Sequence, residues 1–313
     1  MLKIFVLLFA VFALNANAVA QQADSLKPKP TDRSLAIPYP KSLGETWNLY
    51  PEVDPLPQKI DYPLLIGASA VTIAAGVTVH VIQYNAWWRQ QDAEFRIIND
   101  WHYARWIDKV GHFYGTNILA HSFTAAMEAA NFQTRESYIF GSALAFAFQM
   151  YVEIEDGFGP QWGFSPGDAL FDFLGASYHL GQYYFPMLRN FQPRWSYLPS
   201  EKMKNGQHEG NFIDDYEGQI YWIGMRVNNL LPNSWAEYWP SFLMVSAGMG
   251  VSNLDGSGGG TNEFYLALDL DWEEIIPLHG KFWSFVKNTL NYFHFPMPGV
   301  RISPNAAAFI IVF

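Results

Sequence analysis

The stretch that decides the fold runs from residue 108 to residue 179 and contains Asp108-Lys-Val-Gly-His112, Glu153-Ile-Glu-Asp156 and Gly163-Phe-Ser-Pro-Gly-Asp168. Its acidic and histidine residues stand inside otherwise apolar helical patterns. An unpaired charge buried there would cost several kcal/mol. These side chains must therefore contact one another, water or a ligand.

Helical spacing arranges these residues in three polar stripes. Asp108 and His112 are four residues apart and share a helix face, with Lys109 beside them. The other two stripes are Ser142, Gln149, Glu153 and Asp156, and Asp168, Asp172, Gly175 and His179. Three stripes on three adjacent helices predict a single buried polar site rather than three exposed faces.

The helix that contains Asp168 has a clear predicted start. Ser165 stands at the N-cap, Pro166 at the first helical position and Asp168 at the third, which is the pattern of a capping box. A carboxylate there is also favoured by the helix dipole. Asp168 can therefore be interpreted either as a capping residue or as part of an active site. Asp172 lies one turn deeper in the helix, where capping explains it less well.

Working outward, helical patterns cover residues 105–129, 136–154 and 166–185, and residues 63–82 precede them without one charged side chain. Together they predict a four-helix bundle. The 63–82 segment fits both a membrane span and a buried core helix, because it is long enough but rich in small residues. Trp87-Trp88-Arg89 favours the membrane, since aromatic residues gather at bilayer interfaces.

After residue 190 the pattern changes to short aromatic and β-branched segments, at 219–227, 241–251, 263–271 and 308–313. These predict strands, with Gly256–Gly260 as a loop between two of them. The expected fold is mainly α: a four-helix membrane-associated bundle over 61–190, followed by a small antiparallel β-rich part over 191–313 that packs on the helices or on a membrane surface.

The N-terminus has the features of an export signal. Lys3 precedes an apolar run from Ile4 to Leu14, and small residues follow, which predicts a signal peptide over 1–20 cleaved after Ala18 or Ala20. The alternative is an uncleaved membrane helix, although the run is short for one. Residues 21–60 contain seven prolines and are expected to form an extended arm or linker.

Composition narrows the function classes. The 313 residues are 50% hydrophobic and 15% charged, with a net charge of −10 and no cysteine. An acidic chain lacks the basic surface that nucleic acid requires. The missing cysteines exclude a disulfide framework, a thiolate nucleophile and a Cys-ligated metal.

The polar stripes suggest two kinds of chemistry. His112 with Glu153 and Asp168 or Asp172 could bind a divalent metal, or act as a general acid–base set on a lipid-linked substrate. No zinc helix, nucleophile elbow or phosphate loop is present, so no cofactor is expected beyond the option of a divalent metal. His121 and Glu128 share another face and are expected to serve a different contact.

The combined pattern of Asp108-Lys-x-x-His112-Phe, Glu153-x-x-Asp156-Gly-Phe158, Gly163-Phe-Ser-x-x-Asp168 and Gly175-Ala176 resembles the uncharacterised family of predicted periplasmic lipoproteins (YfiM-like), in its longer Bacteroidetes-type version. More distantly it is similar to VanZ-like membrane proteins. The resemblance implies an envelope protein without established activity. The positions that match the family pattern are Asp108, Lys109, His112, Glu153, Asp156, Ser165 and Asp168. The missing lipobox cysteine, Val152 in place of a lysine and Asp172 in place of an asparagine depart from the family pattern.

Two hypotheses of function follow, with a scaffold or transport accessory as a third. The first is an exported envelope protein, structural or accessory, with a buried His/Glu/Asp cluster. The second is a membrane-associated hydrolase or transferase acting on an envelope lipid or glycan, with His112 and Glu153 as the acid–base pair and Asp168 orienting them or binding metal. Membrane lipids are the expected partners, and nucleic acid is not. The signal and the terminal Phe313 favour the outer membrane or periplasmic side over the inner membrane.

Overall fold

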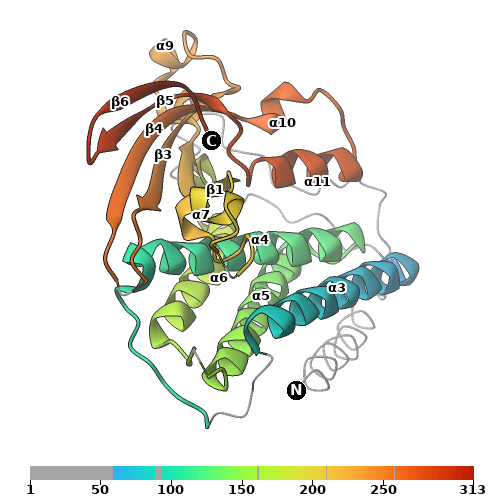
Figure 1. Cartoon of the computed structure of the whole chain (residues 1–313). Helices are drawn as coiled ribbons and strands as arrows, with labels where there is room; N and C mark the ends of the chain where they lie inside the picture. The colour runs from blue at the N-terminus through green and yellow to red at the C-terminus, as the bar shows by residue number, and fades with distance from the viewer. Residues whose placement is uncertain (1–58, 89–93, 161, 209, 257) are drawn as a thin grey trace.

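The structure is a computed structural model of the whole chain, and it describes residues 59–88, 94–160, 162–208, 210–256 and 258–313 (Figure 1). The predicted signal peptide and nearly all of the predicted arm lie outside the described residues.

Long helices form the first half of the described chain. They are α3 (Tyr62–Gln83), α4 (Ile107–Ala129), α5 (Thr134–Gly157) and α6 (Pro166–Tyr184), with the short turns η1 (Tyr84–Trp88) and η2 (Tyr103–Trp106) between α3 and α4. Each predicted helix is confirmed, although α5 extends beyond the expected 136–154. Caps fix two of the starts: Asp61 Oδ1 accepts a hydrogen bond from the backbone N–H of Leu64, and Ser165 caps α6.

Helices α4 and α6 approach each other closely at Gly175. A Cβ atom at this position would lie 2.2 Å from the carbonyl oxygen of Phe113, so only glycine fits. The close approach lets the amide of Asn117 donate to the carbonyl oxygen of Gly175 at 3.0 Å. This contact sets the spacing between the two helices that carry most of the polar stripes.

The second half of the chain forms one six-stranded antiparallel sheet in the order β1-β2-β3-β4-β5-β6. The strands are β1 (Phe191–Tyr197), β2 (Gln219–Met225), β3 (Leu243–Ser252), β4 (Thr261–Leu270), β5 (Met297–Ser303) and β6 (Ala307–Val312). Short helices connect or flank them: η3 (Pro186–Asn190), α7 (Glu201–Lys204), η4 (Tyr216–Gly218), α8 (Val227–Leu230), α9 (Asn233–Ala236), α10 (Trp272–Ile275) and α11 (Lys281–Leu290).

The four predicted strands are confirmed, and the described residues between β3 and β4 form no helix or strand, but the prediction missed β1 and β5. Each missed strand contains a proline, which lacks the N–H that a central strand needs. Pro193 is tolerated because β1 is an edge strand. Pro298 lies at the point where the register between β5 and β6 shifts.

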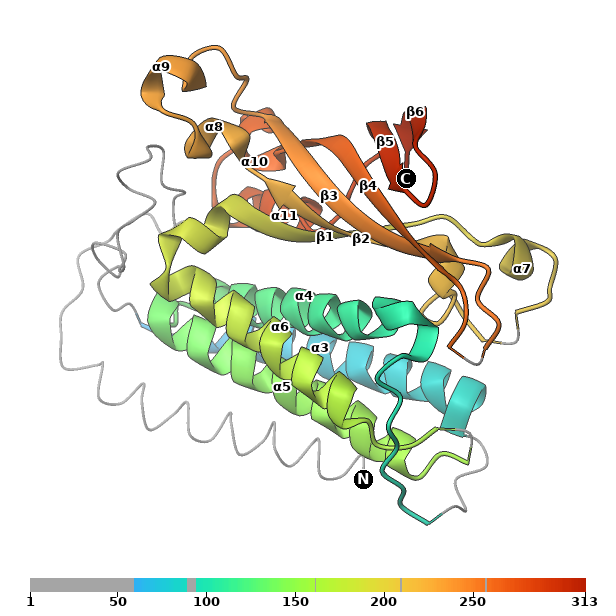
Figure 2. The same cartoon turned by 90° about the vertical axis from the view of Figure 1, so that its left-hand side faces the viewer.

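Helix α4 lies between the sheet and the other long helices, as Figure 2 shows. Tyr114 of α4 packs against Tyr221 of β2, and its hydroxyl donates to the carbonyl oxygen of Tyr292 at 2.8 Å. His121 stacks on Tyr292 and lies 3.0 Å from the hydroxyl of Thr289 in α11. The expectation that His121 serves a different contact from His112 is therefore confirmed.

A second buried polar network lies within the C-terminal part. Asp269 of β4 pairs with Arg194 at 2.8 Å, contacts Nδ1 of His294 at 2.8 Å and accepts a hydrogen bond from Ser246 at 2.6 Å. Trp222 stacks on His294 with ring centroids 4.1 Å apart. All these side chains are buried, so the network joins strands β1, β2, β3 and β4 to the segment before β5.

Candidate functional site

Lys109 is the charged centre of the site at the start of α4. Its side chain is fully buried, and Nζ lies 2.7 Å from Asp100, 3.0 Å from Asp108 and 2.8 Å from Asp168. Burial alone would lower its pKa, but the charges of Asp108 and Asp168 outweigh burial and raise it. One lysine therefore neutralises part of a group of three carboxylates.

His112 lies one turn further along α4, between two pairs of carboxylates. Its Nδ1 is 3.2 Å from Asp172 Oδ1 and 3.6 Å from Glu153 Oε1, whereas Nε2 is 3.8 Å from Asp108 Oδ1 and 3.9 Å from Asp168 Oδ1. Burial opposes a charge on the ring, but Asp172 and Asp168 raise the pKa of His112 well above its usual value. The imidazole is 19% exposed, so solvent reaches it.

The two carboxylates on the Nδ1 side of His112 are almost completely buried. Asp172 Oδ1 accepts hydrogen bonds from Thr116 at 2.8 Å and Gln149 at 3.2 Å. The other oxygen, Asp172 Oδ2, has no hydrogen-bond partner among the described residues. Glu153 Oε2 accepts a hydrogen bond from the backbone N–H of Ser165 at 3.2 Å.

Burial also controls the protonation of two carboxyl groups. It raises the pKa of Glu153 to about 9, against the opposing charge of His112, and Asp168 adds to the increase. It raises the pKa of Asp168 to about 7, with His112 and Lys109 acting in the opposite direction. At neutral pH, Glu153 therefore keeps its proton, whereas Asp168 titrates near neutral pH.

The start of α6 departs from the predicted capping box in one respect. Ser165 Oγ accepts a hydrogen bond from the backbone N–H of Asp168 at 3.1 Å, as predicted. The Asp168 carboxylate does not complete the box, because it pairs with Lys109 while Glu153 takes the N–H of Ser165. The side chain of Asp168 thus belongs to the charged cluster, and the cap is shared between two helices.

The structure brings six residues of the three stripes together with Lys109 and Ser165. The six are Asp108, His112, Gln149, Glu153, Asp168 and Asp172. The structure places Asp156 and His179 elsewhere. Asp156 accepts a hydrogen bond from the indole of Trp88 at 2.6 Å, and burial raises its pKa to about 6. His179 contacts Thr124 at 2.9 Å, far along α6 from Asp168. Ser142 is buried as well, but its hydroxyl forms no hydrogen bond in the described part of the chain.

Two members of the site had no signal in the helical patterns. Asp100 lies in an irregular segment and binds both Lys109 and the hydroxyl of Ser165, the latter at 2.5 Å. Tyr216, from η4, donates a hydrogen bond to Asp108 Oδ1 at 2.6 Å. The second contact brings the C-terminal part of the chain into the site.

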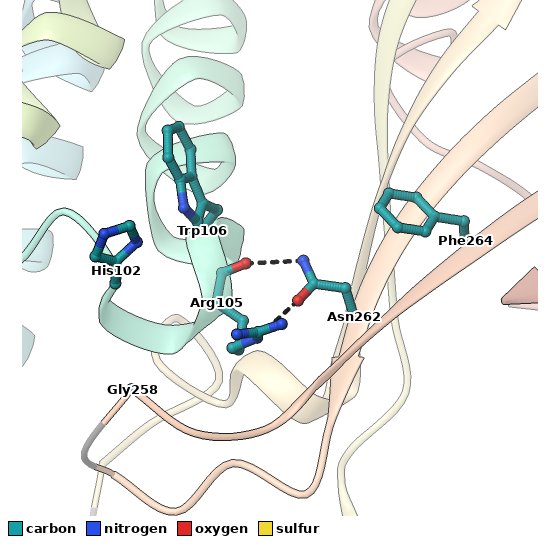
Figure 3. A pocket seen from close by; sticks show the side chains of 6 residues that line it. All are labelled: His102, Arg105, Trp106, Gly258, Asn262 and Phe264. Carbon is teal, nitrogen blue, oxygen red and sulfur yellow. Dashed lines mark hydrogen bonds between the residues drawn. The ribbon is translucent and has the colours of Figure 1, made fainter. Parts of the chain in front are cut away.

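The backbone that leads into α4 has an unusual conformation. Ala104, Arg105 and Trp106 have φ angles of 44°, 57° and 77°, in the left-handed region that is unfavourable for residues with a side chain. Asn262 at the start of β4 stabilises this turn, since it accepts from Arg105 Nε at 2.9 Å and donates to the Arg105 carbonyl at 3.0 Å. A pocket of about 570 Å³ lies here, lined by His102, Arg105, Trp106, Gly258, Asn262 and Phe264 (Figure 3).

Two overlapping groups of side chains have the composition of a metal site. Asp108, His112 and Asp168 form one, and His112, Glu153 and Asp172 form the other. Within each group, the candidate ligand atoms lie within 4.8 Å of one another. His112 belongs to both, one through each ring nitrogen.

Fold and site together define a protein with packed helices, an antiparallel sheet across one side of them, and a buried charged cluster where three helices meet. Residues 99–183 match the family described as "Predicted periplasmic lipoprotein (DUF2279)", which confirms the resemblance over the segment that contains the helical part of the site. The match supports export to the cell envelope, on the periplasmic side. No curated protein and no solved structure matches the chain.

Proposed function

We propose that this is a membrane-attached envelope protein with a structural or accessory role, whose helices lie with one apolar face against lipid. The observation that carries the proposal is the outer surface of α3 and α6. Along these two fully described helices, no exposed side chain is charged. Helix α3 contains no Asp, Glu, Lys or Arg, and the two aspartates of α6, Asp168 and Asp172, are buried. Large apolar surfaces of this kind mark contacts with membranes or proteins.

Helix α3 has the features of a helix in contact with lipid. It is 22 residues long, and among the described helices it alone is both long and apolar enough to cross a bilayer. Ile66 and Val71 are 67% and 70% exposed. The exposed hydroxyl of Thr78 donates to the carbonyl oxygen of Ala74 at 2.8 Å, so this polar group needs no water.

Aromatic residues stand at both ends of the apolar helix. Tyr62 begins α3 and Tyr84 follows its last residue, and both side chains are exposed. Tyrosine is enriched at the interface between lipid and water, because its ring is apolar and its hydroxyl is polar. The pair therefore supports lipid as the partner of this face.

Other long helices also expose apolar side chains. Leu170, Phe173 and Leu174 of α6 are exposed, as is Ile154 of α5. The sheet covers the opposite side of α4 (Figure 2). This arrangement favours attachment by one face of the helical layer over a bundle that crosses the bilayer, since only one side of the layer is free for lipid.

The charged cluster supports a structural role in this protein. Lys109, His112 and their carboxylate partners come from α4, α5, α6 and the segment before η2. Breaking a buried ion pair costs more than an exposed one, because the remaining charge has lost its solvent. The cluster thereby keeps the three helices in one arrangement.

Flotation with lipid vesicles tests the proposal. The full-length chain should float with vesicles of phosphatidylethanolamine and phosphatidylglycerol, and Ile66→Asp together with Val71→Asp should reduce the floated fraction severalfold. Tyr238→Asp is the matched control, because this residue is 82% exposed but lies after α9. A wild-type chain that stays at the bottom of the gradient, or a control that loses binding equally, would contradict the proposal.

A hydrolase or transferase acting on an envelope lipid or glycan is the second candidate. His112 reaches solvent, and the cluster contains groups that titrate near neutral pH. Because the pKa values of both His112 and Glu153 are raised, both side chains are proton donors at neutral pH. Asp168, with a pKa of about 7, would then accept the proton, which changes the expected acid–base pair.

Mass spectrometry of an envelope lipid extract and of cell-wall glycan fragments, each incubated with the purified chain, tests this candidate. A product that disappears with His112→Gln and persists with His121→Gln would support it. Identical spectra with and without the wild-type protein would reject it.

A further inference from the structure

We propose that His112 Nδ1, Glu153 Oε1 and Asp172 Oδ1 form a binding site for one divalent transition metal ion. The three side chains come from α4, α5 and α6, so the ion would lie where the three helices meet. This site does not depend on membrane attachment, and the two proposals are tested separately.

The distances between the three atoms fit a coordination sphere. Nδ1 of His112 is 3.2 Å from Asp172 Oδ1 and 3.6 Å from Glu153 Oε1. Bonds of about 2.0–2.2 Å from a metal to nitrogen and carboxylate oxygen, at tetrahedral or octahedral angles, place neighbouring ligand atoms about 3.0–3.5 Å apart. The candidate ligand atoms of the three residues all lie within 4.8 Å of one another, so side-chain shifts would bring them to these distances.

The free oxygen of Asp172 is an independent indication of a ligand. Asp172 is 0% exposed, yet its Oδ2 atom has no hydrogen-bond partner in the described part of the chain. A buried carboxylate oxygen without a partner is unfavourable by about 1–3 kcal/mol or more. A cation bound by both oxygens of the Asp172 carboxylate would remove this penalty.

Charge distinguishes the Nδ1 side of His112 from the Nε2 side. On the Nε2 side, Lys109 already binds Asp108 and Asp168. In the described structure, the ion pairs of Glu153 and Asp172 are to His112, and neither has a lysine or arginine partner. The Nδ1 side is therefore the one without a lysine or arginine.

The residues around the ligands fit the outer shell of a metal site. A histidine that binds metal through one nitrogen usually donates its other N–H to a carboxylate. Nε2 of His112 faces Asp108 and Asp168, at 3.8 and 3.9 Å, and Lys109 fixes both carboxylates. Thr116 and Gln149 hold Asp172 in the same way.

The donor set selects the class of metal. One imidazole, two carboxylates and no sulfur suit Zn²⁺ or Mn²⁺, whereas Mg²⁺ and Ca²⁺ prefer oxygen ligands alone. Three protein ligands leave at least one coordination position for water or for an oxygen atom of a ligand. The partial exposure of His112 gives such a molecule access to the ion.

Isothermal titration calorimetry with ZnCl₂ tests the site on the untagged, full-length chain after treatment with EDTA. Wild type should bind one Zn²⁺ per chain, more tightly than Mg²⁺. Asp172→Asn and Glu153→Gln should each weaken binding at least tenfold, since each replaces a carboxylate ligand with an amide of the same shape. X-ray absorption should show one imidazole among nitrogen and oxygen ligands.

Matched variants exclude general effects of the substitutions. Asp156→Asn lies three residues from Glu153 on α5 and should bind Zn²⁺ as wild type does, as should His121→Gln on α4. Circular dichroism checks that each variant is folded without metal. If a ligand variant does not fold, Gln149→Met takes its place, because it removes only the hydrogen bond from Gln149 to Asp172. No stoichiometric binding by wild type, or equal losses in the controls, would overturn the proposal. A loss with Asp168→Asn but not with Asp172→Asn would overturn the choice of the Nδ1 side.

Discussion

Replacing Lys109 with methionine tests whether the charged cluster stabilises the fold. Methionine keeps the length of the buried stem but removes the ammonium group that contacts Asp100, Asp108 and Asp168 at 2.7–3.0 Å. Three acidic side chains would then face one another without a cation. Asp168 is the most sensitive of them, because burial already raises its pKa to about 7.

The expected loss follows from the burial of the pair. Removing one partner of a buried ion pair destabilises a protein by about 3–5 kcal/mol. At about 2–4 °C per kcal/mol for a chain of this size class, the midpoint of thermal unfolding should fall by about 6–20 °C. The apolar contacts of the stem are retained by methionine, so the loss is due to charge.

Urea unfolding followed by tryptophan fluorescence, at pH 7.5 in EDTA, measures this loss. Adding Asp168→Asn to the Lys109→Met variant should recover part of the stability, because it removes one of the unpaired carboxylates. A loss below about 1 kcal/mol, or no recovery in the double variant, would refute the structural role of the cluster.

Burial lowers the pKa of His121 to about 4, so the unfolded chain binds a proton at a higher pH than the folded chain does. Up to about 3 kcal/mol of stability is therefore lost as the pH falls from about 6.5 to about 4. In urea unfolding, His121→Gln should reduce this pH dependence. Gly175→Ala should destabilise by about 1–3 kcal/mol, because the added methyl group meets the backbone of Phe113, and thermal unfolding with an unchanged midpoint would disprove the close contact. Arg194→Met should destabilise by about 3–5 kcal/mol, since Asp269 loses its buried partner, as calorimetry of the variant would show.

The helices of the fold could be predicted from the sequence because their signals are local. Apolar periodicity located each helix, and Pro63 and Ser165 marked two starts. The strands β1 and β5 could not be found in this way, because a proline is acceptable there only through position in the sheet. Whether a strand lies at the edge of the sheet, as β1 does, or where the register shifts, as β5 does, is decided only when the sheet assembles. The residue pattern of a single strand does not contain this information.

The site was predictable to the extent that helical spacing is a guide to proximity. Spacing brought His112, Glu153, Asp168 and Asp172 into one group, since each lies where its helix meets the other two. It failed for His179, because a stripe identifies a face of the helix but not which neighbour that face meets at each turn. Asp100 and Tyr216 lie outside any stripe and join the site only through the tertiary fold.

The turn before α4 connects the two halves of the chain, and this connection affects the order in which the chain folds. Its left-handed residues are held by Asn262, which is 157 residues away from Arg105, and Asp108 is held by Tyr216, which is 108 residues away. Contacts this distant in sequence form slowly and require most of the chain. The helices are synthesised first, but their charged cluster is completed only after the strands have arrived. A chain truncated after the last long helix should therefore be a poor folding unit, exposed to proteases and aggregation until its missing half is supplied.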